Sequence, residues 1–156
     1  MIKLLRNIEL SLFFKSKFYN FFINNNAEKK ILFNPESLWK GSKSNGIRIL
    51  DGFLSFQNET LSLDKNVWNK NHGSSSWNDH LHSFMWVKDI RAVGTNNARI
   101  FFRQNLLAWI DRINYSNEQI WKQDVLAKRI FYLLTNLSFF FETADQSFQK
   151  KLSEHL

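Results

Sequence analysis

The sequence predicts a mainly α-helical fold with a small β hairpin or meander near residues 47–63. The 156-residue chain contains one proline and five glycines, and so few helix-breaking residues favour long helices over a β sandwich with many turns. Its hydrophobic content of 44% is sufficient for a packed core. Apolar residues also recur at helical spacing over most of the second half of the chain. We therefore expect residues 1–156 to form a single domain or a fragment of one.

The first 24 residues are expected to form an amphipathic helix. Leu4, Ile8 and Leu12 recur at helical spacing, and basic residues lie among them. The apolar run is too short and too charged for a signal peptide or a membrane span. We expect this helix to pack on its own protein, and contact of residues 2–23 with a membrane surface is the alternative.

A change from helical to strand-like spacing occurs between residues 39 and 63. Short runs of β-favouring residues lie at residues 47–50, 53–56 and 60–63. Asp51-Gly52 is typical of a two-residue hairpin turn, because the central positions of that turn need positive φ. Asn58-Glu59 is a weaker second turn. The pattern predicts two or three strands that pack against the helices.

Residues 78–156 are expected to form antiparallel helix pairs. The first pair consists of a helix over 81–93 and a second helix after Gly94, which can adopt the left-handed conformation that ends a helix. The second helix has an apolar stripe at Ala98, Phe102, Leu106, Trp109 and Ile113. A further helix is predicted over 124–141, and Asp145 can cap a last one.

Polar residues within the helix predicted over 81–93 are the candidate site residues. His82 and Asp89 are spaced i, i+7 and share one side of this helix with Trp86, while Arg91 lies on another side. Buried charge is costly unless it is paired or faces a polar cavity. The helix therefore either forms internal ion pairs around a core histidine or lines a ligand groove.

A second polar line lies on the helix predicted over 124–141. Arg129, Tyr132 and Asn136 follow each other at i, i+3 and i+7, which places them on one side of the helix. This line is either a solvated face or a set of side chains that faces a groove.

The formal charge of +7 and the sequence pI of about 9.7 favour polyanionic partners: nucleic acid, anionic lipid or acidic polysaccharide. Nucleic acid is the less favoured of these, because lysines and arginines are spread along the chain without a run of five or six. The absence of cysteine excludes a disulfide framework and a thiolate metal site. His80 and His82 are two residues apart, so on a helix they face different directions and predict no metal site. No phosphate loop or nucleophile elbow is present, and no cofactor is predicted.

Several stretches, in chain order, resemble the heparinase II/III family of polysaccharide lyase-like proteins. Residues 39–41 and 46–56 are similar to the short β segment of that family. Residues 81–92 are similar to its LHxFxWLRDLRA stretch, and residues 121–130 are similar to its W-x-x-DVLxRRL pattern. The resemblance implies the amino-terminal part of an α/α toroid, built from antiparallel helix pairs and incomplete in this chain. It also implies a bacterial protein that cleaves a uronic-acid polysaccharide by β-elimination.

The resemblance gives the chain no catalytic residue. The catalytic Asn, Tyr and His of the family lie further along the chain, and no position here matches their motifs. The segment is therefore expected to be inactive alone and to have the remainder of a longer chain as a partner. A periplasmic location is implied by the family, although no convincing signal peptide is present.

An acidic polysaccharide is the partner that the resemblance implies. Trp86 is then expected to stack on a sugar ring, and His82, Asp89, Arg91 and Arg129 to make polar or charge contacts. The alternatives are a basic helical module that binds nucleic acid or a membrane surface, and a purely structural helical scaffold. Convergence of the candidate residues on one concave surface would favour the first hypothesis, and internal pairing of all of them would favour the scaffold.

Overall fold

The computed structural model describes most of the chain from Trp39 onward. The described residues are 35, 39–64, 67–68, 72–112 and 117–153. The amphipathic helix expected over residues 1–24 lies outside them, and so does the membrane contact considered for residues 2–23. Ile113, the last residue of the predicted apolar stripe, also lies outside.

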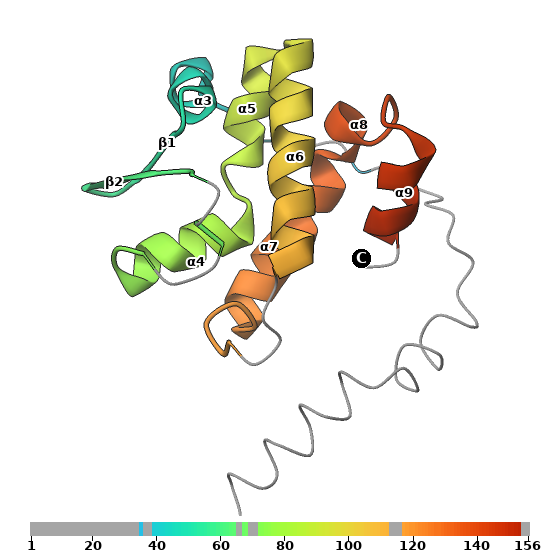
Figure 1. Cartoon of the computed structure of the whole chain (residues 1–156). Helices are drawn as coiled ribbons and strands as arrows, with labels where there is room; N and C mark the ends of the chain where they lie inside the picture. The colour runs from blue at the N-terminus through green and yellow to red at the C-terminus, as the bar shows by residue number, and fades with distance from the viewer. Residues whose placement is uncertain (1–34, 36–38, 65–66, 69–71, 113–116, 154–156) are drawn as a thin grey trace, which may run out of the picture.

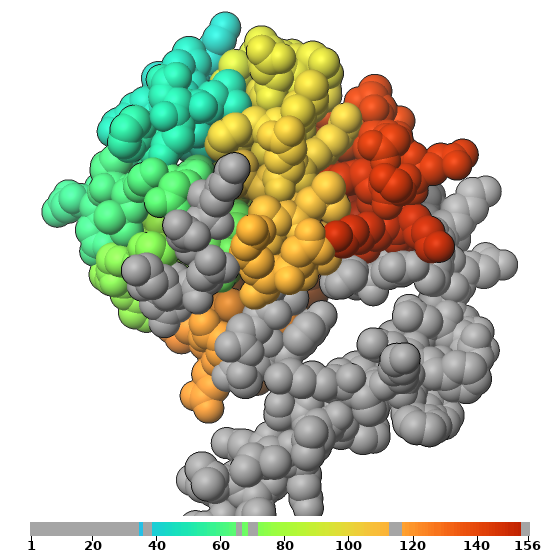
Figure 2. Space-filling view, viewed as in Figure 1, coloured from blue at the N-terminus to red at the C-terminus, as the bar shows by residue number. Residues whose placement is uncertain are grey.

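The described residues form seven helices and one two-stranded antiparallel sheet, which confirms the mainly α fold with a small β hairpin. In chain order the elements are α3 (Lys43–Leu50), β1 (Phe53–Phe56), β2 (Glu59–Ser62), α4 (Ser75–Ser83), α5 (Val87–Val93), α6 (Asn96–Arg112), α7 (Gln123–Thr135), α8 (Leu137–Phe140) and α9 (Gln146–Ser153). Figure 1 shows α6 near the middle, with α3 and the hairpin on one side and α8 and α9 on the other. The same order is visible across the packed surface in Figure 2.

The β segment is smaller than predicted. Residues 47–50 belong to α3, whose N-cap Ser42 accepts a hydrogen bond from the Asn45 N–H at 3.3 Å. Strand β1 pairs only with β2, and the turn between them lies at residues 57–58. The predicted hairpin turn at Asp51-Gly52 is therefore wrong. Gly52 does have a positive φ of 91°, but it follows the end of a helix. A positive φ at glycine is typical both of hairpin turns and of helix ends.

The helix predicted over 81–93 is broken in the middle. Helix α4 ends at Ser83, Phe84 is left-handed with φ 54°, and α5 begins at Val87. The left-handed conformation costs a non-glycine residue about 1–2 kcal/mol. Phe84 is fully buried, and burial of its ring stabilises the fold by about 2–3 kcal/mol, which offsets that cost. Because of the break, His82 and Asp89 do not share one helix face.

The predicted helix ends at Gly94 and Asp145 are confirmed, and Ser74 and Thr95 supply two further caps. Ser74 caps α4 by accepting the Trp77 N–H at 3.1 Å. Gly94 ends α5 with φ 75°, and Thr95 then accepts the Ala98 N–H at 3.2 Å. Asp145 caps α9 by accepting the Phe148 N–H at 2.8 Å. In each case a polar side chain next to a periodic segment satisfies an otherwise unpaired backbone donor, or glycine adopts a positive φ.

The core lies along α6 and on one side of α7. Helix α6 buries Ala98, Phe102, Leu106 and Trp109, as the sequence predicts. Helix α7 buries Val125, Arg129 and Leu133, whereas Ile130 is 43% exposed. The helix predicted over 124–141 is also interrupted at Asn136. The Asn136 side-chain amide donates to the Tyr132 carbonyl at 2.8 Å, a local bond of the kind that competes with helix continuation.

Candidate functional site

Arg129 lies at the centre of a buried polar cluster between α4, α6 and α7. Its Nη2 donates to the Ile120 carbonyl at 3.1 Å, and its Nη1 lies 3.4 Å from the His82 carbonyl. The guanidinium carbon lies 4.8 Å from the ring centre of Trp109 and 5.0 Å from that of Trp121. Arg129 is only 3% exposed, so it belongs neither to a solvated face nor to a set of side chains that faces an open groove.

No carboxylate of the described residues forms an ion pair with Arg129. Burial lowers its pKa to about 10, which leaves the guanidinium protonated at neutral pH. Backbone carbonyl oxygens accept its N–H groups, and the negative faces of two indole rings attract the cation. These contacts offset the cost of taking the charge out of water. We call Arg129, His82, Trp109 and Trp121 the Arg129 cluster.

His82 is a buried neutral histidine in this cluster. Its Nδ1 accepts a hydrogen bond from Trp109 Nε1 at 3.2 Å, so the ring proton lies on Nε2. The pKa of His82 is lowered to about 4, first by burial and then by the nearby Arg129 charge, whereas Asp79 acts in the opposite direction. His82 is therefore uncharged at neutral pH and serves as a hydrogen-bond acceptor inside the core.

Trp86 is a core residue with no exposed surface. Its Nε1 donates to the Leu81 carbonyl at 3.1 Å, and its ring packs at 5.4 Å from Phe84 and 5.6 Å from Phe102. Stacking of a sugar ring requires an accessible indole face. The stacking role expected for Trp86 is therefore incompatible with its position in this structure.

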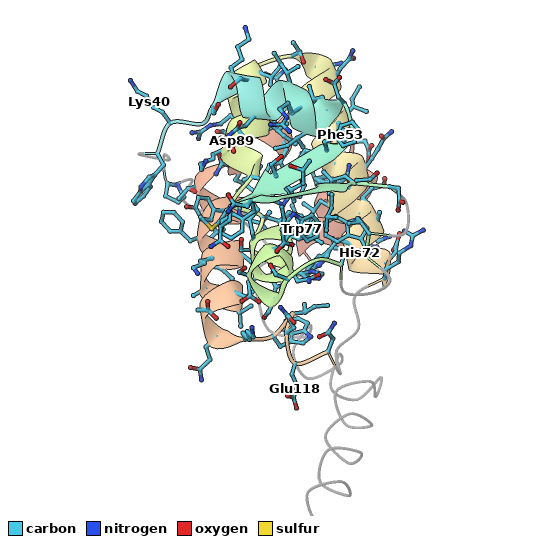
Figure 3. The ribbon with its side chains drawn as sticks, turned by 90° about the vertical axis from the view of Figure 1, so that its left-hand side faces the viewer. Lys40, Phe53, His72, Trp77, Asp89 and Glu118 are labelled. Carbon is cyan, nitrogen blue, oxygen red and sulfur yellow. The ribbon has the colours of Figure 1, made fainter. Side chains whose placement is uncertain are left out.

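Asp89 and Arg91 lie on α5, where they hold the segment that precedes α3. Asp89 Oδ1 accepts the backbone N–H of Ser42 at 2.7 Å and the Lys88 ammonium at 2.9 Å. Arg91 Nη2 donates to the Trp39 carbonyl at 3.0 Å. Asp89 is 6% exposed and lies between α5 and α3 (Figure 3). Both residues thus connect positions about fifty residues apart in the chain.

A small polar cavity of about 20 Å³ lies next to Asp89. Its lining residues are Asn45, Arg48, Ile49, Phe53, Leu54, Ser55, His80 and Asp89. His80 stacks on Phe56 at 4.3 Å, and its buried Nδ1 has no hydrogen-bond partner. A cavity of this size holds about one water molecule, so no sugar ring fits there.

The structure divides the five predicted site residues into separate groups. His82 and Arg129 meet in the Arg129 cluster, Asp89 and Arg91 act on the segment before α3, and Trp86 belongs to the core. The sequence interpretation missed Trp109 and Trp121 as partners of Arg129. Their wide spacing from Arg129 gives no local signal, because the contacts form only when the helices pack.

The described part of the chain contains no group of three or more His, Asp or Glu side chains placed to hold a metal ion. None of its helices is both long enough and apolar enough to cross a membrane.

Comparison of the chain with models of known protein families, with curated proteins and with solved structures finds no match. The function must therefore be argued from the residues and their contacts.

Proposed function

We propose that this chain is the amino-terminal toroid segment of a heparinase II/III-like polysaccharide lyase, and that its buried polar residues hold the helices of that segment together. The complete protein would cleave a uronic-acid polysaccharide by β-elimination. The observation that carries the proposal is that the separate stretches resembling this family interlock in the fold. Each interlock involves residues that the resemblance places far apart in the chain.

The first interlock joins residues 39–46 to residues 81–92. A Cβ on Gly41 would lie 1.9 Å from the Lys88 carbonyl oxygen, and a Cβ on Gly46 would lie 2.2 Å from the Asp89 carbonyl oxygen. Both distances are far too short for any side chain. The glycines therefore allow the backbone before and within α3 to lie directly on α5, where Asp89 then binds the Ser42 N–H.

The second interlock joins residues 81–92 to residues 121–130. Arg129 lies against the His82 carbonyl and against the ring of Trp121. Thus Arg129 of α7, Trp121 and His82 of α4 form one unit. Their contacts give a structural reason why the two stretches of sequence occur together.

The same contacts favour a structural role over direct substrate contact for these residues. His82, Asp89 and Arg129 are nearly inaccessible to solvent, so a polysaccharide cannot reach them in this conformation. A purely structural helical scaffold without a lyase is consequently the second candidate function. It requires the same internal pairing and differs only in the absence of elimination chemistry.

A basic nucleic-acid or membrane module has less support. Several cations of the described helices are used internally: Arg99 and Arg103 donate to the Phe139 and Phe140 carbonyls at 3.2 and 2.7 Å. Lys122 pairs with Asp79 at 3.1 Å. A surface for polyanions would need such cations to face solvent together.

The test is an elimination assay with the complete gene product that contains these residues. The purified protein is incubated with several uronic-acid polymers, and the unsaturated uronate product is followed by its ultraviolet absorbance. We expect product from at least one polymer, and none from residues 1–156 alone. A folded complete product that releases no unsaturated uronate from any polymer would reject the lyase and leave the scaffold.

A further inference from the structure

An exposed aromatic pair joins the segment before α3 to helix α7. Trp39 is 52% exposed and Phe131 of α7 is 39% exposed. Their rings are in edge contact, with centres 5.3 Å apart and planes at 82°. We call Trp39 and Phe131 the apolar platform.

The platform is held in place from several directions. Arg91 binds the Trp39 carbonyl at 3.0 Å. Two residues later, Gly41 lies directly on the α5 backbone. On the other side, the ring of Phe131 packs edge-on against Tyr132 at 5.2 Å. The backbone of Trp39 is held by α5, and its indole packs on Phe131 of α7. The indole is therefore preorganised for a ligand.

Cationic groups lie beside this platform. Arg91 is in contact with residue 39 itself, and Lys40 follows it and points away from the body of the protein (Figure 3). Among the described residues, no carboxylate forms an ion pair with Arg91 or Lys40. The site therefore places a half-exposed indole next to two cationic side chains.

The size of the platform argues against a protein partner. Two aromatic side chains that are about half exposed present on the order of 200 Å². A stable protein interface buries about 800 Å² on each partner. An indole face matches instead the apolar C–H face of a single sugar ring, and the positive charge matches an acidic group on that sugar.

We infer that Trp39 and Phe131, with Arg91 and Lys40, form a binding site for an acidic sugar residue. The inference rests on the proposed function, because it names where this segment contacts an acidic polysaccharide. It moves the sugar-stacking role from the buried Trp86 to the exposed Trp39. The site stacks one ring on the Trp39 indole and places its carboxylate or sulfate against the two cations.

Isothermal titration calorimetry of the chain tests this site, because its signal does not depend on the Trp39 indole. The ligands are an oligogalacturonate of four units and the neutral maltotetraose. We expect Trp39→Ala to weaken oligogalacturonate binding about tenfold. Lys40→Ala should weaken oligogalacturonate binding about threefold. Maltotetraose should bind the unchanged chain about threefold more weakly than oligogalacturonate does. Trp39→Phe keeps an aromatic ring and should lose less than Trp39→Ala.

Phe53→Ala is the matched control, because Phe53 is an aromatic residue of β1 with a similar exposure of 50%. Its affinity should equal that of the unchanged chain. Equal affinities of Trp39→Ala and Phe53→Ala, no binding of oligogalacturonate at all, or a platform that drives only self-association would each overturn the site. Trp39-dependent binding by a complete product without elimination activity would instead reject the lyase alone.

Discussion

Replacement of Arg129 by alanine should be among the most destabilising single changes in the described residues. The variant leaves the carbonyls of Ile120 and His82 without the donor that lies 3.1 and 3.4 Å away. Each buried acceptor without a partner costs about 1–3 kcal/mol. The side chain also fills the space between Trp109 and Trp121, and this packing is lost too. We expect a loss of about 3–5 kcal/mol in the free energy of unfolding.

Urea denaturation followed by circular dichroism measures this change. For a chain of this length, 1 kcal/mol corresponds to about 2–4 °C in Tm, so thermal unfolding should shift by roughly 10–15 °C. Arg129→Lys keeps the positive charge but replaces the planar fork by a compact ammonium, and should lose about half as much. A loss of that size would show that geometry, as well as charge, is required at this position.

Lys128→Ala is the control on the neighbouring position. Lys128 pairs with Asp124 at 3.2 Å on the surface of α7, and such pairs contribute about 0.3–0.5 kcal/mol. If Arg129→Ala lowers the free energy of unfolding no more than Lys128→Ala does, the Arg129 cluster does not hold the helices together and the reasoning is refuted.

Three further predictions concern other parts of the fold. Gly46→Ala should lower the free energy of unfolding by about 2–4 kcal/mol in chemical denaturation, because its Cβ would collide with the Asp89 carbonyl. Gly94 has open space around it but a φ of 75°, so Gly94→Ala should lower it by only about 1 kcal/mol. Equal losses would contradict the close α3–α5 contact. The pKa of His82 is about 4 in the folded chain and 6.5 ordinarily, so the unfolded chain binds the proton more tightly and stability should fall as the pH drops from 6.5 to 4, by on the order of 3 kcal/mol. Burial lowers the pKa of His80 to about 4 as well, so His82→Gln should reduce the slope of this pH profile by about half. An unchanged slope would exclude His82 as one of its sources. Ser74→Ala removes the cap of α4 and should cost about 1 kcal/mol, whereas no measurable loss would mean that water replaces the hydroxyl.

Local features of the sequence were sufficient for the helix ends and for α6. Ser74, Gly94 and Asp145 act within three residues of their own positions, so a short window of sequence contains both the cap and the group that it satisfies. The stripe of α6 has the helical period on one side. These elements depend on contacts that the local chain already specifies.

The candidate site could be predicted only in part. Residue types were informative for the helix predicted over 81–93, where charge among apolar neighbours indicated internal pairing, and Asp89 indeed accepts the Ser42 N–H. For Arg129 the sequence indicated a solvated face or a groove, and the residue is instead buried and bonded. Its partners were not predictable, since the Ile120 carbonyl and the rings of Trp109 and Trp121 come from separate elements. Trp39 and Trp86 could not be ranked either, because the sequence does not say which indole is covered when the helices pack.

The sequence by itself determined the helical class, the caps and the residue types that make up the Arg129 cluster. Only the tertiary structure decided that residues 47–50 are helical, that Phe84 breaks a helix and that α7 turns its Arg129 side inward. The physical reason is the range of the deciding contacts. Caps and periodicity act over a few residues, whereas the energy that bends the chain at Phe84 and buries Arg129 comes from rings and carbonyls that meet only in the folded protein.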